Sequence, residues 1–245
     1  AWMLLGCNGD VVVKYGMSRN KSSVSDILGH YSGVVVCDGE DHYDFYAQEH
    51  ANDVTLARCN AHCRRKFEHA LKDDGNRAAY ALRVYRIIYR RERYLKERNA
   101  PPDMVLRFRA RSKQLMEHLR QYCLKLRTDT LPKSPLGKAA RYLLRFYDDL
   151  VRFGDDGMVP VDNNDVERII RKFVIGRKAW LFSSSEEGAR ASAVLYSLVL
   201  TCIHNQIPVY DYLNDVIERI GVNKETNYPA LLPRTWWAQH NTPSA

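Results

Sequence analysis

Two acidic residues stand where the chain could bind a metal ion. Asp38 follows the short apolar run GVVVC, and Glu167 lies within the arginine-rich segment VERIIRK. Carboxylate oxygens are the ligands that Mg²⁺ prefers, and arginine side chains attract phosphate groups. Together, these residue types could place a divalent cation beside a surface that binds phosphates.

Each carboxylate also has a simpler explanation. Glu167 could form a surface ion pair with Arg171, four residues further along a helix, which stabilises a helix by only ~0.2–0.5 kcal/mol. On local evidence alone, this is the better explanation of Glu167. Asp38 precedes Gly39, and Asp-Gly is common in turns, so a turn residue is the commoner explanation in the absence of other motifs. Two lower-ranked acidic candidates lie close by: Asp41 and Asp44.

A cluster of sulfur and imidazole groups, Cys59, His62 and Cys63, invites a zinc interpretation. A structural zinc site needs four ligands. We reject zinc because the sequence has no second C-x-x-C or H-x-x-H pair. The basic residues that follow are suited to phosphate contacts: Arg64, Arg65 and Lys66.

Short β-forming segments would position Asp38 and the residues around it. Residues 33–37 are β-branched and bounded by glycine, which predicts a buried strand with Asp38 at its C-terminal end. Residues 54–59 predict another strand, and a helix follows it. Residues 1–15 predict a hairpin, because an Asn-Gly turn separates two apolar runs.

A helix is predicted over residues 164–173, and it would carry Glu167. Short polar residues with oxygen acceptors precede it, and Pro160 disfavours helix before them. The helix would bury a stripe of apolar residues at helical spacing: Val166, Ile169, Ile170 and Phe173.

The middle of the chain is predicted to be helical and is strongly basic. Long helices are expected over residues 80–97, 104–126 and 136–153. Residues 58–127 contain 20 Lys and Arg against 7 Asp and Glu, a net charge of +13, so the remainder carries −5 of the total of +8. Such uneven charge suggests a polyanionic partner. A solvated helical face is the alternative, and charge alone does not decide between them.

Composition sets further bounds on the 245-residue chain. No apolar run approaches the ~20 residues that a membrane span needs, and we expect no membrane partner. The six cysteines are scattered, so reduced thiols are expected. We expect the sequence to begin part-way through a domain, because its first residue is Ala and the first six residues read as strand interior. Residues 223–245 lack periodicity and predict an irregular tail. Two residues of this tail, Trp236 and Trp237, could pack back onto the domain.

Several motifs in matching order resemble the catalytic segment of insertion sequence 66 family transposases, which are of the DDE type. The resemblance is strongest in DNNDVERIIR, GRKAWLF and GARASAVLYSL, and it continues upstream in GVVVCDGEDHYD, ARCNAHCRRKF and LPKSPLGKAARYLLRFYDDL. It covers most of residues 31–220. Agreement of separate motifs in one order is far more specific than a single short pattern.

The resemblance implies an α/β fold: a ribonuclease H-like mixed sheet with a large basic all-α insertion and C-terminal helices. Residues 1–70 would form the N-terminal part of the catalytic core, without its first strand. Residues 71–155 would be the helical insertion. Residues 156–222 would complete the core with the helix that bears Glu167, and the irregular tail would follow.

The resemblance also implies the site and its partners. Asp38 and Glu167 would be the second and third metal ligands, and two Mg²⁺ or Mn²⁺ ions are expected in the complete enzyme. His62, in a C-x-x-H element, would lie near the site; a capping or core histidine is the equal alternative. The partner would be double-stranded DNA, at element ends and target, bound by a homo-oligomer in the bacterial cytoplasm at the nucleoid. Phosphate contacts are expected from Arg64, Arg65, Lys66, Arg168, Arg171, Arg177 and Lys178.

One part of the family pattern is missing from this sequence. The family's first acidic residue lies on a strand upstream of the hairpin, and no residue among the first ten fits that role. The chain is therefore expected to be an N-terminally truncated form with little or no transposase activity by itself. The alternatives are a ribonuclease H-like nuclease without strand transfer and an inactive DNA-binding remnant.

Overall fold

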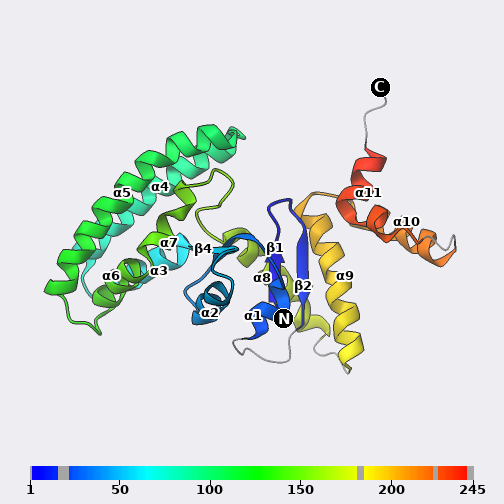
Figure 1. Cartoon of the computed structure of the whole chain (residues 1–245), viewed down its shortest axis with the longest axis horizontal. Helices are drawn as coiled ribbons and strands as arrows, with labels where there is room; N and C mark the ends of the chain where they lie inside the picture. Colours follow the sequence, from blue (N-terminus) through cyan, green and yellow to red (C-terminus); the bar gives the residue numbers. More distant parts are fainter. Residues whose placement is uncertain (1, 16–21, 181–184, 223–225, 242–245) are drawn as a thin grey trace. The chain divides into compact units, whose positions relative to one another are not determined.

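The computed structural model describes residues 2–15, 22–180, 185–222 and 226–241, with the side chains of residues 22, 23 and 177–180 left out. The chain forms two compact units (Figure 1). We call Ala1–Arg19 together with Asp165–Ala245 the terminal unit, and Asn20–Asn164 the central unit.

The terminal unit is built on the predicted hairpin, which is confirmed. Strands β1 (Trp2–Leu5) and β2 (Val11–Lys14) pair antiparallel, and Gly9 in the turn has a φ of 88°, which a residue without a β-carbon adopts at low cost. Helix α9 (Glu186–His204) lies along β2 (Figure 1).

Helix α9 covers the edge of β2 with hydroxyl groups. The amides of Val11 and Val13 donate hydrogen bonds of 2.9 Å to Thr201 Oγ1 and Ser197 Oγ. These amides face away from β1, and no described strand pairs with that edge of β2. The two hydroxyls therefore accept the hydrogen bonds of backbone donors that the sheet leaves unpaired.

Helix α8 (Asn164–Trp180) is longer than the predicted helix, and its buried stripe is narrower. Ile169 and Phe173 are buried against Val11 and Val13, as the periodicity predicts. The placement of Ile170 in that stripe is wrong, because its side chain is 38% exposed at the edge of the helix face.

The predicted irregular tail is wrong over much of its length. After α10 (Val209–Gly221) come a 3₁₀ turn, η2 (Tyr228–Leu231), and helix α11 (Pro233–His240). Pro233 starts α11 at a position where a missing N–H costs nothing. Trp236 packs back as expected: it is buried, and its Nε1 donates to Asp215 at 2.6 Å.

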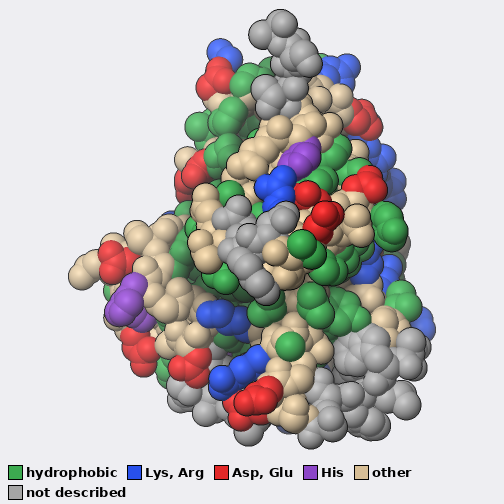
Figure 2. Space-filling view, turned by 90° about the vertical axis from the view of Figure 1, so that its right-hand side faces the viewer, with side chains coloured by type: hydrophobic (Ala, Val, Ile, Leu, Met, Phe, Trp, Pro, Cys, Tyr) green, Lys and Arg blue, Asp and Glu red, His purple; other side chains and the backbone are tan. Residues whose placement is uncertain are grey.

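The face of the terminal unit that carries α10 is partly apolar. Hydrophobic side chains lie among charged ones at the surface in Figure 2. On α10, Tyr210 is 80% exposed and Ile217 67% exposed. Tyr212 and Val216, on the opposite face of this helix, are buried in a hydrophobic cluster.

The central unit contains the second pair of strands, β3 (Gly33–Cys37) and β4 (Val54–Arg58), which run parallel as two strands joined by a crossover helix must. Helix α1 (Ser22–Leu28) precedes them and α2 (Asp41–Glu49) connects them. The bounds predicted for the first of these strands are confirmed. Its predicted burial holds only at Cys37, since the other four residues are partly exposed.

Helices make up the rest of the central unit. Helices α4 (Gly75–Glu97) and α5 (Pro102–Asp129) lie side by side (Figure 1), with α3 (Asn60–Ala70), α6 (Pro135–Arg145) and α7 (Tyr147–Val151) packed on them. A short turn, η1 (Arg152–Gly154), follows.

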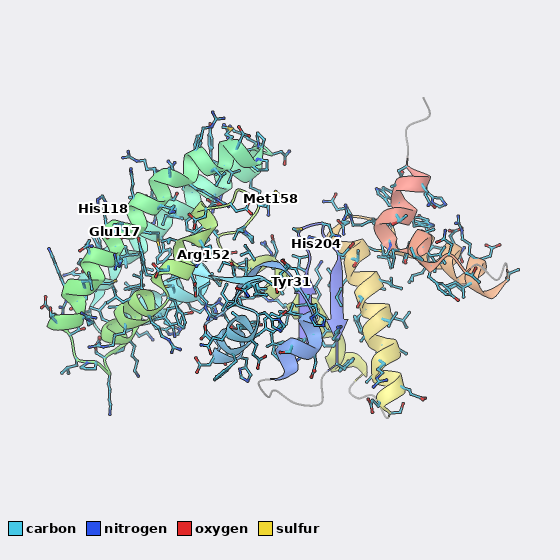
Figure 3. The ribbon with its side chains drawn as sticks, in the orientation of Figure 1. Tyr31, Glu117, His118, Arg152, Met158 and His204 are labelled. Carbon is cyan, nitrogen blue, oxygen red and sulfur yellow. The ribbon has the colours of Figure 1, made fainter. Side chains whose placement is uncertain are left out.

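The helix predicted over residues 136–153 is broken at Phe146, where φ is −107° and ψ 19°. Two hydrogen bonds hold the segment after the break. The Tyr147 hydroxyl donates to Glu117 on α5 at 2.7 Å, and Arg152 Nε donates to the Leu56 carbonyl at 2.9 Å; Glu117 and Arg152 are labelled in Figure 3.

The fold class is confirmed as a mixture of helices and strands in which helices predominate. The described strands form two separate pairs in place of the predicted single mixed sheet, so a ribonuclease H-like sheet stays a prediction. Within the described ranges, no helix combines the length and the apolar character that crossing a membrane requires.

A buried arginine holds the loop that leads out of the central unit. Arg109, on α5, is 5% exposed and forms two hydrogen bonds with Glu92, of 3.0 and 2.7 Å. Its Nη1 donates to three backbone carbonyls, those of Phe153, Asp156 and Val159. Arg109, although it lies within the basic residues 58–127, is therefore structural and is not available to bind a polyanion.

Replacing Arg109 by methionine should lower the free energy of unfolding by about 3–5 kcal/mol, because it leaves a half-buried carboxylate and three carbonyls without their donor. Urea denaturation followed by circular dichroism measures the change. Arg107→Met on the same helix is the matched control: Arg107 pairs with Asp103 at the surface, and its loss should cost less than about 1 kcal/mol. Equal losses in the two variants would contradict the structural role of Arg109.

Candidate functional site

The carboxyl ends of the two parallel strands meet at one edge of the central unit. Asp38 follows β3 directly, and Cys59 follows β4, with its amide donating to the Cys37 carbonyl at 2.8 Å. Loops at this edge of a parallel sheet are where α/β folds bind ligands. Asp38 therefore lies where the sequence predicts it, at a strand end.

Arg58, the last residue of β4, anchors the loop that carries Asp38. It is 1% exposed, and its Nη1 donates to the Asp38 carbonyl at 2.5 Å. Its Nη2 pairs with Asp44 on α2, and its Nε lies 3.5 Å from Asp149 on α7. The guanidinium also lies 4.7 Å from the centre of the Phe146 ring.

The charge of Arg58 is maintained despite its burial. Burial by itself lowers the pKa of Arg58, but Cys37, Asp44 and Asp149 raise it, and the result lies above the ordinary value. A buried charge of this kind is tolerated only when it is paired and hydrogen-bonded. Arg58 was not singled out from the sequence, where it is one basic residue among many.

Asp38 differs from the acidic residues of the first turn of α2. Asp44 pairs with Arg58, and Asp41 accepts a hydrogen bond of 3.0 Å from Arg145. The Asp38 carboxylate accepts one hydrogen bond through Oδ1, from the Glu40 amide at 3.1 Å, and its Oδ2 has no partner among the described residues. Asp38 is thus a carboxylate directly at the end of a strand that keeps one free acceptor oxygen among the described residues.

The residue after Asp38 permits a close approach from α6. A β-carbon added to Gly39 would lie 2.6 Å from the Tyr142 hydroxyl oxygen. Lys66 Nζ lies 4.5 Å from the centre of the Tyr142 ring. Through this aromatic ring, the structure brings the predicted phosphate-binding Lys66 to the loop of Asp38.

Asn60 fixes the segment that leads into α8 against the end of β4. It is buried, and its Nδ2 donates to the carbonyls of Leu150 and Val161 at 2.8 and 3.1 Å. Its own amide donates to Val161 as well, and its Oδ1 accepts from the Tyr85 hydroxyl at 3.3 Å. The one signal for it in the sequence is a polar residue inside the C-x-x-H element.

The predicted start of α8 is confirmed, and Asp162 supplies the acceptors. Its Oδ1 and Oδ2 accept from the amide and the side chain of Asn164, at 3.0 and 2.6 Å. Burial, and then the charge of Asp162, raise the pKa of Tyr89. The Arg64 guanidinium lies 5.6 Å from the Tyr89 ring centre, so a second predicted phosphate-binding residue lies beside this segment.

Glu167 lies in the first turn of α8 and is partly buried. The ion pair with Arg171 that offered its simpler explanation is not formed between these two described side chains, and Arg171 is exposed. Arg168 pairs with Asp165 instead. Asp38 belongs to the central unit and Glu167 to the terminal unit, so a metal site shared by the two stays a prediction.

The remaining predicted site residues are placed as follows. His62 lies in the first turn of α3 and is partly buried, and Arg65 is exposed on the same helix. The side chains of Arg177 and Lys178 lie outside the described residues.

The metal prediction can be compared with the donors that the described residues offer. No group of three or more His, Cys, Asp or Glu side chains capable of holding a metal is found among them. The free Asp38 oxygen is a hard donor at a fixed strand end, which fits one ligand position of Mg²⁺ or Mn²⁺.

Comparisons with known proteins agree on one family. A family model described as Transposase IS66 family matches residues 1–191. Uncharacterized protein y4jD of Sinorhizobium fredii (strain NBRC 101917 / NGR234) is 31% identical over 231 residues, 91% of this chain and 45% of the relative. Uncharacterized protein y4qI of that strain is 30% identical over 230 residues, 91% of this chain and 42% of the relative. The chain thus spans less than half the length of these relatives, and no solved structure matches it.

The buried thiols near the site are expected to react slowly. Burial raises the pKa of Cys37 and of Cys63 to about 12, and it also raises the pKa of Cys59. All six cysteines are free thiols, and Cys7 alone among them is exposed. A thiol must ionise to react, so raised pKa values keep the buried groups protonated at neutral pH.

At pH 8, in the presence of a chelator, a disulfide-exchange reagent should therefore react rapidly with one thiol per folded chain and with six after unfolding. Absorbance of the released thiolate measures the stoichiometry. Cys7→Ser should remove the rapid reaction, whereas Cys37→Ser should leave it unchanged. Two or more rapid thiols in the folded chain would show that the strand ends are more open than described.

Proposed function

The chain belongs to the IS66 transposase family, and from this membership we propose that it carries two of the three metal-binding carboxylates of a DDE-type transposase, Asp38 and Glu167. The observation that carries the proposal is the state of Asp38. Its loop is anchored by the buried Arg58, and Asp38 retains a free oxygen at the end of β3, whereas Asp41 and Asp44 on α2 pair with arginines.

The metal requirement follows from the reaction. Two Mg²⁺ or Mn²⁺ ions, when bound, supply stabilisation of the charge that develops on the attacking and leaving oxygens in phosphodiester displacement. Asp38 and Glu167 would provide oxygen ligands, and fixed ligands reduce the cost of arranging the site. His62, near the end of β4, is proposed as a third residue of the site.

The substrate proposed for the whole protein is double-stranded DNA. Water would attack a phosphodiester bond at the end of the element and displace a 3′-hydroxyl, and this hydroxyl would then attack a phosphodiester of the target. Basic residues near the carboxylates would hold the backbone phosphates, as arginine and lysine do in protein–DNA contacts. Those proposed here are Arg64, Arg65, Lys66, Arg168 and Arg171, with Arg177 and Lys178.

The ribonuclease H-like fold and the first acidic residue form the last part of the proposal. A strand outside these 245 residues would supply that residue, which is consistent with a chain that spans less than half of its relatives. Strands β1 and β3 each have one edge without a strand partner in the described chain, which leaves positions where a further strand could pair. The helices between residues 71 and 155 would then be an insertion, and a homo-oligomer would act on DNA.

Hydroxyl-radical mapping with Fe²⁺ in place of Mg²⁺ tests whether Asp38 and Glu167 share a metal. Bound Fe²⁺ with ascorbate and peroxide should cut the chain near residue 38 and near residue 167, because radicals react close to the ion that forms them. Mass spectrometry of the fragments locates the cuts. Excess Mg²⁺ should suppress both.

The variants Asp38→Asn and Glu167→Gln should each weaken both cuts at least about tenfold, since each removes a charged ligand. Asp41→Asn is the matched control, because Asp41 lies three residues after Asp38, at the start of α2, and pairs with Arg145 at the surface. Cuts at one of the two positions only would refute a shared site.

In a protein that contains all three carboxylates, DNA cutting without strand joining would favour the nuclease alternative, and DNA binding without metal-dependent cutting would favour the inactive DNA-binding remnant.

A further inference from the structure

One face of α4 carries four arginines, and Glu92, which lies between two of them in the sequence, is hydrogen-bonded to Arg109 of α5 instead. The four arginines are Arg83, Arg86, Arg90 and Arg93, which we call the arginine stripe. Their spacing of three, four and three residues places them within roughly 80° of arc at 3.6 residues per turn. All four are exposed, and the buried residues of α4 lie on the opposite face: Ala78, Ala81, Val84, Tyr85, Ile88 and Leu95.

The arginine stripe is a run of neighbouring arginines on one helix face, none of which has an acidic partner among the described residues. Several of the other surface arginines pair with a carboxylate one helical turn away, as Arg64 does with Glu68 and Arg107 with Asp103. In the described structure no stripe guanidinium forms an ion pair or a hydrogen bond, and Glu97, four residues after Arg93, forms no pair with it. The recorded contact is a long one, 5.9 Å from Arg83 to the Tyr80 ring centre.

Four unpaired like charges at this spacing repel one another, and each neighbouring pair destabilises the helix. A polyanion laid along the stripe would remove that repulsion. Arg93 lies ten residues after Arg83, so the stripe is ~15 Å long at 1.5 Å per residue. Phosphates of one DNA strand advance ~3.4 Å along the helix axis, so this length matches about four of them.

We infer that the arginine stripe of α4 binds the phosphate backbone of duplex DNA, at a surface separate from the residues proposed to hold the metal. The inference rests on the proposed function for the identity of the polyanion. Guanidinium groups bind phosphates through paired hydrogen bonds, which the ammonium group of lysine cannot form. Arginine in all four positions therefore suits a phosphate partner better than lysine would. The contacts are to the backbone, so they position the DNA and do not read its sequence.

The test is binding of the full chain to a labelled 30-base-pair duplex, followed by fluorescence anisotropy in EDTA over a range of salt concentrations. Replacing all four stripe arginines by glutamine should lower the affinity at ~0.1 M salt at least about tenfold. The slope of log affinity against log salt should become shallower by about 3–4, because each lost phosphate contact removes ~0.9.

A charge-matched control variant replaces four paired surface arginines by glutamine: Arg77, Arg107, Arg120 and Arg190. It removes the same formal charge as the stripe variant. Its arginines are already paired with carboxylates, so the slope of log affinity against log salt should change by less than about 1. Thermal unfolding of both variants verifies that each remains folded. Equal losses in the two variants would overturn the inference, because they would show a general effect of net charge.

The outcome also separates this inference from the metal proposal. Asp38→Asn and Glu167→Gln should bind the duplex at least as tightly as the parent chain in EDTA. Unchanged DNA binding by the stripe variant, or no duplex binding by the parent chain, would refute the stripe while leaving the Fe²⁺ cuts as they are. Displacement of the DNA by polyglutamate at equal charge concentration would also refute it, because the surface would then lack a preference for phosphates.

Discussion

The burial of one guanidinium organises the central unit. Arg58 lies at the end of a strand with almost no exposure to water, where an unpaired charge would cost several kcal/mol. The fold compensates by bringing two carboxylates and a backbone carbonyl to it from three different segments. One of those segments is the loop of Asp38, so the position of the proposed metal ligand depends on an interaction in which its own side chain takes no part.

The basic residues of the chain serve three different purposes, and net charge does not distinguish them. Arg58 and Arg109 are buried and hold backbone carbonyls in place. Arginines such as Arg107 form surface pairs that contribute little to stability. A third group, on α4, has no acidic partners. The +13 charge of residues 58–127 therefore overstates the charge that is available to a polyanion.

Local patterns predicted those elements whose cause is local. The hairpin, the strand that ends at Cys37 and the start of α8 depend on turn chemistry, β-branched runs and capping, all of which are legible in sequence. The break at Phe146 and helix α11 depend on tertiary packing, and an eight-residue helix is too short to show a period. For the same reason the candidate carboxylates could be named, whereas the contacts of Arg58 and Asn60, which come from distant segments, could not.

The hydroxyls of α9 decide how the hairpin can grow. An unpaired strand edge is a template for another chain, and proteins usually protect it with charge, proline or a bulge. Here Thr201 and Ser197 already occupy the outward amides of β2, so that edge is sealed by a helix. β-Augmentation of the hairpin, whether by a neighbouring segment or by a second molecule during self-association, is thereby restricted to the side of β1. The direction in which this small sheet can be extended is thus set by two side chains nearly two hundred residues away in the chain.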